Sequence, residues 1–251
     1  MSNILLKKTT AVLLLLFLSS NTLNERKEIP SVLNITFENF ANNHPVVLRD
    51  SVYTNKFGEK YRVTKLRYYI SNICLKSNSA DFKESDSYHL IDENKSGSKS
   101  FSFAANTRAY DSITFLIGVD SLRNVSGAQT GALDPVNDMF WTWNSGYVMM
   151  KFEGNSSSSK QVNQKFEYHI GGYSGKNNVV KRIAFALPRS IFKTDNDTAK
   201  IIITCDLDKW WDGSRTIKIE EHAVVTTPGP LAVTVSENYQ RMFSIDSGIR
   251  P

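Results

Sequence analysis

Hydrophobic and polar residues alternate along most of this chain with the two-residue period that is typical of half-buried β-strands. The pattern is clearest at 32–40, where Leu33, Ile35 and Phe37 are separated by polar residues. A longer run at 61–75 is rich in aromatic and β-branched residues and is predicted as one strand, bent around 71–72. The same reasoning predicts further strands at 88–92, 100–103, 112–119, 147–153, 165–170, 179–187, 200–207 and 216–220.

Helical periodicity is scarce. The best candidate is 233–243, where Val235, Tyr239 and Phe243 recur every four residues and would share one face of an amphipathic helix. About ten short strands with regular turn signals favour an all-β fold, a single immunoglobulin-like β-sandwich with long loops and at most a short C-terminal helix. No repeat, linker or shift in composition divides the chain, so 32–251 is predicted to form one domain.

The first twenty residues have the composition of a secretory signal peptide. Lys7 and Lys8 precede an apolar run at 11–18, which is followed by small and polar residues. This run is shorter than the roughly 20 apolar residues that a membrane-spanning helix needs. We therefore expect 1–20 to be a signal peptide and 21–31 a flexible leader, with an uncleaved N-terminal anchor as the alternative. The mature chain is then periplasmic or secreted and has no membrane span.

The net charge of the chain bears on whether it binds nucleic acid. The formal net charge of +5 falls to +3 without Lys7 and Lys8, and no basic cluster remains, so nucleic acid is not an expected partner.

Cys74 and Cys205 are the only cysteines, and both lie in predicted strands. In an exported chain they either pair as one disulfide or stay buried as separate thiols. Neither belongs to a CxxC motif, which argues against a thiolate metal site.

A long polar loop separates the predicted strands at 112–119 and 147–153, and it ends in the densest apolar cluster of the chain, 139–143. Trp141 and Trp143 are two residues apart, so in extended backbone they share one face. Such rings either plug one end of the core or line a ligand or metal site. We expect any binding surface of this chain to lie near the loop.

Four histidines are the candidate nitrogen ligands for a metal: His44, His89, His169 and His222. No two have an HxH or HxxxH spacing, so a site would have to join residues that are distant in the sequence. His169 is the best placed, since it comes near the end of a predicted strand just before a glycine pair that allows close backbone approach. Each histidine taken singly is also compatible with a structural role.

Other chemistry has little support in the sequence. The absence of GxSxG argues against a serine hydrolase. The loop carboxylates Asp120, Asp134 and Asp138 lack the regular spacing of a calcium loop. We therefore predict no catalytic residues.

Several segments, taken in order, resemble the MbnP-like family of exported bacterial proteins associated with copper handling and, in some members, with methanobactin. The resemblance covers nearly all of the mature chain and includes a segment near the C-terminus, 238–243. The main segments are Tyr68-Tyr-Ile-Ser-Asn-Ile73, Phe115-Leu-Ile-Gly-Val-Asp120, Gly131-Ala-Leu-Asp-Pro135, Met139-Phe-Trp-Thr-Trp-Asn-Ser-Gly-Tyr147, Lys151-Phe-Glu-Gly154 and Tyr168-His-Ile-Gly171.

This resemblance implies a periplasmic β-sandwich that binds copper, expected as Cu(I), through histidines and a tryptophan oxidised to kynurenine by a partner di-haem, MbnH-like oxidase. His169 matches the family's strand-end His-x-Gly, and His44 lies where the family's first turn offers a histidine. Trp141 or Trp143 matches the tryptophan cluster and would be the source of kynurenine. The chain departs from many relatives at 172–175, where it lacks a cysteine.

Two functions follow as hypotheses. The first is a copper carrier or sequestering protein rather than an enzyme, because such a site needs no open coordination position. The second is a metal-free sandwich that binds a peptide, glycan or partner protein through the loop 122–144, since a scaffold can outlive its metal site. The hypotheses differ in whether His169 lies near a second imidazole and an indole.

Overall fold

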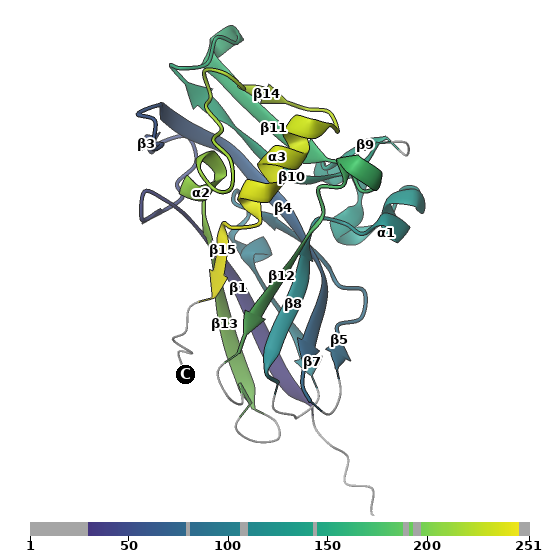
Figure 1. The fold of residues 1–251 in the computed structure, drawn as a ribbon. Coiled ribbons are helices and arrows are strands. Elements are labelled where there is room, and N and C mark those ends of the chain that lie inside the picture. The colour runs from purple at the N-terminus through teal and green to yellow at the C-terminus, as the bar shows by residue number, and fades with distance from the viewer. Residues whose placement is uncertain are drawn as a thin grey trace, which may run out of the picture.

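The computed structural model describes residues 30–78, 81–105, 110–142, 145–187, 191–192 and 197–245. These residues form a mostly β structure made of two mixed sheets (Figure 1). The predicted signal peptide (1–20), all but two residues of the predicted leader (21–31), and Trp143 lie outside the described residues. No helix in the described part of the chain is long and apolar enough to cross a membrane.

The smaller sheet has five strands built around the alternating segment found first in the sequence. Its central strand β1 pairs in parallel with β13, with Phe37 opposite Ile203, and antiparallel with β7 and β2. The β1–β2 turn uses Asn42 and Asn43 at positive φ, a backbone conformation that asparagine tolerates. The strands are β1 (Ser31–Ala41), β2 (His44–Pro45), β7 (Ser100–Ala105), β13 (Thr198–Asp206) and β15 (Phe243–Ile245).

The larger sheet has ten strands and curls into a half-barrel around the long strand β4. Strand β4 is bent as predicted: its pairing with β8 shifts between Ser71 and Cys74, and Asn72 has a φ of 54°. The strands are β3 (Tyr53–Thr54), β4 (Lys60–Lys76), β5 (Phe82–Lys83), β6 (Tyr88–Asp92), β8 (Ser112–Ile117), β9 (Phe140–Thr142), β10 (Gly146–Ser156), β11 (Lys165–Gly171), β12 (Lys181–Ala186) and β14 (Val224–Val225).

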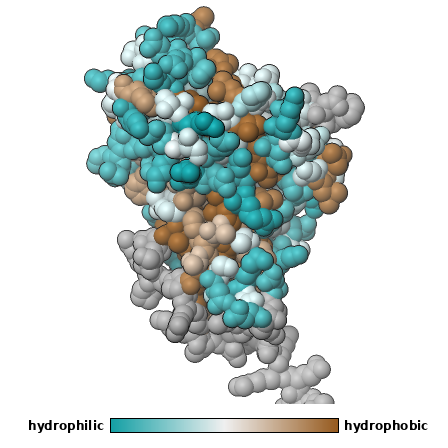
Figure 2. All heavy atoms as spheres, in the orientation of Figure 1, coloured by the Kyte–Doolittle hydropathy of each residue, from teal (hydrophilic) through white to brown (hydrophobic). Residues whose placement is uncertain are grey.

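Aromatic side chains fill the space between the two sheets. Phe37 of β1 lies edge-on to Tyr68 of β4 and to Phe115 of β8, with ring centroids 6.1 and 6.0 Å apart. Phe243 of β15 packs against the same rings. Figure 2 shows hydrophobic surface gathered near β12 and β15, the edge strands where the two sheets approach each other without pairing.

Two helices close the upper part of the half-barrel in the view of Figure 1, next to β10 and β11. Helix α2 (Asp208–Trp211) buries Trp210 and Trp211 completely, against rings of β4, β10 and β11. Helix α3 (Pro230–Tyr239) adds Tyr239. The remaining helical segments are α1 (Ser121–Val125) and the 3-10 turns η1 (Ser96–Lys99), η2 (Gly131–Leu133), η3 (Pro135–Asn137), η4 (Val162–Gln164) and η5 (Gly175–Asn177).

The structure departs from the sequence predictions in four places. The expectation of at most a short C-terminal helix is wrong, because α1, α2 and the 3-10 turns add helical structure elsewhere in the chain. The C-terminal helix exists and buries Val235 and Tyr239, but it ends at Tyr239, and Phe243 belongs to strand β15. The prediction of a strand at 216–220 is wrong, because the only β-pairing in this range is an isolated bridge from Thr216 to Asp212. The immunoglobulin-like arrangement is not confirmed, since β1–β13 and β11–β14 pair in parallel whereas immunoglobulin sheets are antiparallel.

Candidate functional site

The loop between β8 and β10 covers the outer face of the larger sheet, opposite the core. Tyr69 and Tyr147 point outward from β4 and β10, with ring centroids 5.7 Å apart. Their hydroxyls donate to the carbonyls of Ala132 (3.0 Å) and Leu133 (2.8 Å) in the loop. Burial raises the pKa of both tyrosines, so both hydroxyls stay protonated as donors. The loop is therefore a second, smaller packed layer.

Asn124 of helix α1 ties the same loop to β10 and is completely buried. Its amide nitrogen donates to the Val119 carbonyl at 2.7 Å, and its amide oxygen accepts from the Tyr147 backbone at 2.8 Å. Gly146 is required next to it, because a Cβ there would lie 2.2 Å from the Asn124 oxygen. These bonds fix the start of the loop relative to the strand that follows it.

His169 and Trp141 lie on this covered face. His169 points outward from β11, and Gly171, two residues later, shares its face of the strand. The Trp141 ring occupies the space that a side chain at 171 would fill, since a Cβ there would lie 2.5 Å from its Cζ3. The fold thus brings the predicted imidazole and one predicted indole onto the same face.

The His169 ring is hydrogen-bonded to a carboxylate. Its Nε2 lies 2.9 Å from Oε1 of Glu153 on the neighbouring strand β10, and both side chains are about one-fifth exposed. Burial acts to raise the pKa of Glu153, but the His169 hydrogen bond and the charges of Lys65 and Lys151 outweigh it, so the pKa lies below its usual range. Glu153 is therefore an ionised acceptor at neutral pH.

A charge network surrounds this pair. Asp138, just before the aromatic cluster, forms ion pairs with Lys65 (3.2 Å) and with Lys151 (2.9 Å), whose side chain is only 5% exposed. The two lysines outweigh the effect of burial and lower the pKa of Asp138. Lys151 lies directly opposite His169 in the β10–β11 pairing. These bonds hold the end of the loop against the sheet at the His169 position.

The other three imidazoles lie elsewhere. His44 is exposed on β2, in the smaller sheet. His89 stacks on Phe101 with ring centroids 3.5 Å apart, and its Nε2 is 3.0 Å from Glu84. His222 precedes β14, and its carbonyl accepts from Tyr168. No hydrogen bond or ion pair between described side chains joins any of them to His169.

The two cysteines are free, buried thiols in different sheets, which favours the second of the two alternatives left by the sequence. Burial raises the pKa of the Cys205 thiol well above its usual value, so the thiol is protonated at neutral pH.

Cu(I) prefers imidazole and sulfur ligands. Among the described residues, no three His, Cys, Asp or Glu side chains are grouped to hold a metal. The thioether of Met149 accepts the Val119 backbone N–H at 3.2 Å and is buried. The described residues therefore offer one imidazole at this position and do not complete a copper site.

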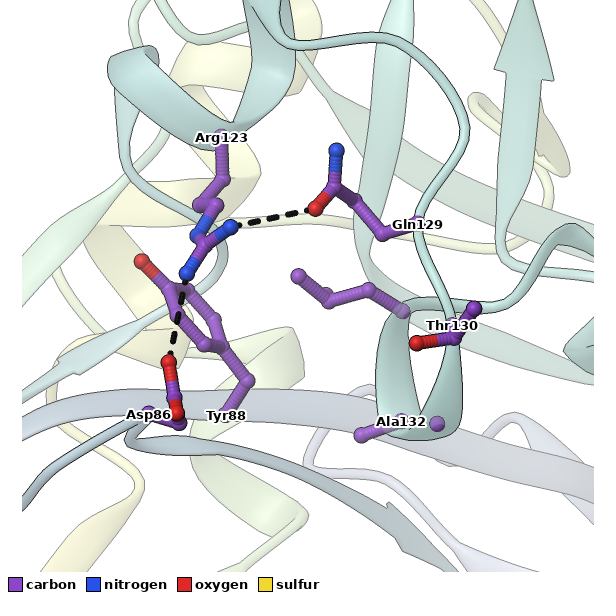
Figure 3. A pocket seen from close by; sticks show the side chains of 8 residues that line it. Asp86, Tyr88, Arg123, Gln129, Thr130 and Ala132 are labelled. Carbon is purple, nitrogen blue, oxygen red and sulfur yellow. Dashed lines mark hydrogen bonds and ion pairs between the residues drawn. The ribbon is translucent and has the colours of Figure 1, made fainter.

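A separate cavity of about 380 Å³ opens where the loop meets β6 (Figure 3). Arg123 of α1 crosses it, stacked 5.3 Å over the Tyr88 ring. Its guanidinium is held by Asp86 (3.3 Å) and by Gln129 (3.1 Å). Thr130 and the turn η2 form another side of the cavity.

Comparison with known proteins decides the family. The family model described as MbnP matches residues 30–228. The chain belongs to the MbnP family. A solved structure, MbnP from Methylosinus trichosporium, is similar with a TM-score of 0.53 at 15% identity, covering 86% of this chain and 98% of that chain. At that identity the likeness shows a shared fold. A comparison with curated proteins found no match.

The sequence predicts His169 and Trp141 as site residues, and both stay predictions, but it does not indicate the groups that the MbnP fold of this chain places around His169. The sequence analysis places Glu153 and Lys151 in a predicted strand and in a segment of the family resemblance but gives them no role at the site, although their alternation on β10 puts both on the face of His169. Arg123 was also missed, because nothing local in the sequence indicates that it crosses to Tyr88. His44 and Trp143 remain predictions, the first in the other sheet and the second outside the described residues.

Proposed function

We propose that this chain is an exported copper-binding protein with a carrier or sequestration role rather than an enzyme, and that His169 is a copper ligand. The observation that carries the proposal is the placement of His169 and Trp141 on one face of β11, beneath an anchored loop. Membership of the MbnP family, which implies a methanobactin-associated copper protein, supports the choice of metal. Periplasmic or extracellular location rests on the composition of 1–20.

Glu153 gives His169 the orientation that a ligand needs. When Nε2–H donates to the Glu153 carboxylate, the lone pair of the ring lies on Nδ1, and a carboxylate partner raises the basicity of that nitrogen. Lys151 and Lys65 reduce the negative charge nearby, so the environment favours a singly charged ion over a divalent one. This favours Cu(I).

The second donor is proposed to come from the tryptophan cluster. Oxidation of Trp141 to kynurenine by a di-haem, MbnH-like partner would supply an aromatic amine on the face of His169. Mass spectrometry of the protein from its native host tests this. We expect a gain of about 4 Da on the peptide that carries Trp141 and Trp143, the mass change of this modification. An unmodified peptide in copper-replete cells would contradict it.

Competition with a Cu(I) chelator tests the ligand assignment. We expect the purified protein to bind about one Cu(I), and His169→Ala to weaken binding at least ~10-fold, because a primary ligand is lost. His222→Ala is the matched control and should leave affinity unchanged. His44→Ala tests the second predicted ligand, and from its place on the other sheet we expect little change. Equal affinity of His169→Ala and the parent would contradict the proposal.

A second function is favoured by the cavity at Arg123. It is lined by the loop 122–144 predicted to bind a partner, and it combines a guanidinium, a tyrosine ring and a glutamine amide. Such a set suits a carboxylate-bearing peptide or a glycan. If copper binding is absent while Arg123→Ala abolishes capture of such a ligand, the chain is an interaction module of the MbnP fold.

A further inference from the structure

A second cavity, of about 600 Å³, lies on the outer face of the larger sheet where β4, β5, β8 and β12 come together in the lower half of Figure 1. Three side chains that line it form one row across neighbouring strands. Cys74 of β4 is paired with Lys83 on one side and with Thr114 on the other. Directly opposite residues in such pairs have Cβ atoms about 5 Å apart, so the row is compact.

Thr114 lines this cavity, and its buried hydroxyl is a hydrogen-bond donor whose bond is not made within the described structure. The residue is 5% exposed, and its hydroxyl has no hydrogen-bond partner among the residues that the structure describes. A buried hydroxyl without a partner costs free energy, and native structures keep few of them. The hydroxyl oxygen is shielded from solvent in this structure, so an acceptor that enters the cavity satisfies this donor only after a rotation about χ1 turns the hydroxyl toward it.

The charged side chains around the cavity leave a positive excess. Lys76 is paired with Asp81 at 3.2 Å, and Glu84 is bonded to Ser87 and to His89. Lys83 from β5 and Arg182 from β12 line the cavity from opposite sides and form no ion pair with a described residue. Two cations thus flank a buried donor.

We propose that this cavity binds the oxyanion group of a small molecule, a phosphate or a carboxylate, with Thr114 donating to it and Lys83 and Arg182 flanking it. Guanidinium and ammonium groups together with a hydroxyl are the donors that such anions receive in proteins. The cavity lies in the size range of small-molecule sites, so the group belongs to a molecule larger than a free ion. Nothing in this site depends on copper.

Calorimetric titration of the purified protein at low ionic strength tests the proposal, with inorganic phosphate in one arm and succinate in the other. We expect saturable binding of at least one probe, and the tighter probe identifies the class of oxyanion. Lys83→Gln with Arg182→Gln should weaken it at least ~10-fold, since both flanking charges are lost. The control pair, Lys200→Gln with Arg241→Gln, removes the same charge from exposed positions elsewhere and should change it less than twofold.

Thr114→Val separates a binding role from a structural one. Valine keeps the shape of threonine and removes the unpaired hydroxyl, so we expect the melting temperature to be unchanged or higher while affinity for the probe falls at least ~5-fold. Absence of binding to both probes would overturn the proposal, and so would binding that both the Lys83→Gln, Arg182→Gln double variant and Thr114→Val retain.

Discussion

Gly171 is the residue that lets Trp141 lie beside His169. Its lack of a side chain leaves room for the indole, and the Tyr147 carbonyl would also be 3.0 Å from an added Cβ. The sequence indicated this indirectly, since a glycine pair after His169 predicted close approach of something to the backbone. Which ring approaches could not be predicted, because it depends on the path of a loop some thirty residues upstream.

Substitution of Gly171 by alanine tests this packing. The new methyl group would collide with the Trp141 ring, so we expect the free energy of unfolding in urea to fall by about 1–3 kcal/mol, the usual cost of overpacking. Gly97→Ala is the control, since a Cβ there meets no atom within 4 Å, and it should change stability by less than about 0.5 kcal/mol. Equal stability of the two variants would show that the indole does not occupy this space.

The ionised carboxylate of Glu153 predicts a pH dependence. Its pKa, like that of Asp138, is lower in the folded chain than usual, so its contribution to stability is present above its unfolded pKa and is lost as the pH falls through the folded value. We expect the unfolding free energy to drop between roughly pH 5 and pH 3, and to drop less in Glu153→Gln. Glu38→Gln, on an exposed part of β1, should behave as the parent. An unchanged acid profile in Glu153→Gln would contradict this.

At the scale of elements, the strands were largely predictable and their pairing was not. The alternation at 32–40 and the bend near 71–72 became β1 and the bulged β4, because both are local consequences of side-chain period and backbone preference. The parallel partner of β1, strand β13, follows it by more than 150 residues, and no local pattern specifies such a pairing. The small helix α2 could not be predicted from the sequence, because its two tryptophans are stabilised by tertiary burial rather than by helical propensity.

Strand β7 is the element that joins the smaller sheet to β5 and β6 of the larger one. Phe101 stacks on His89, and Phe103 stacks on Phe82 with ring planes 5° apart. His89 therefore has a structural role, because its ring forms part of the contact between β6 and β7. This contact also explains why that imidazole is not free for a ligand.

The substitution Phe101→Ala tests whether these ring contacts join β7 to the larger sheet. Loss of its ring contacts with His89 and Phe37 should lower the free energy of unfolding by about 2–3 kcal/mol in chemical denaturation. Val136→Ala removes a side chain that is 82% exposed and should have almost no effect. If Phe101→Ala proved no less stable than that control, β7 would not join the sheets through these rings.

At the scale of the whole molecule, the core and the candidate sites use opposite faces of the larger sheet. The inner face holds the aromatic core, whereas the outer face carries the anchored loop, the His169–Glu153 pair and both cavities. Family membership was accessible from the sequence because its motifs are local. The position of one imidazole and one indole on the same face required the fold.

Side-chain NMR of the four imidazoles during Cu(I) addition tests the central claim most directly. Each histidine gives its own ring nitrogen signals, so the residue that binds the metal is identified without a substitution. We predict that the His169 signals shift and saturate at about one equivalent, as expected for a primary ligand, while those of His89 and His222 stay in place. If the His169 signals do not move while copper is bound, the proposed copper site is wrong.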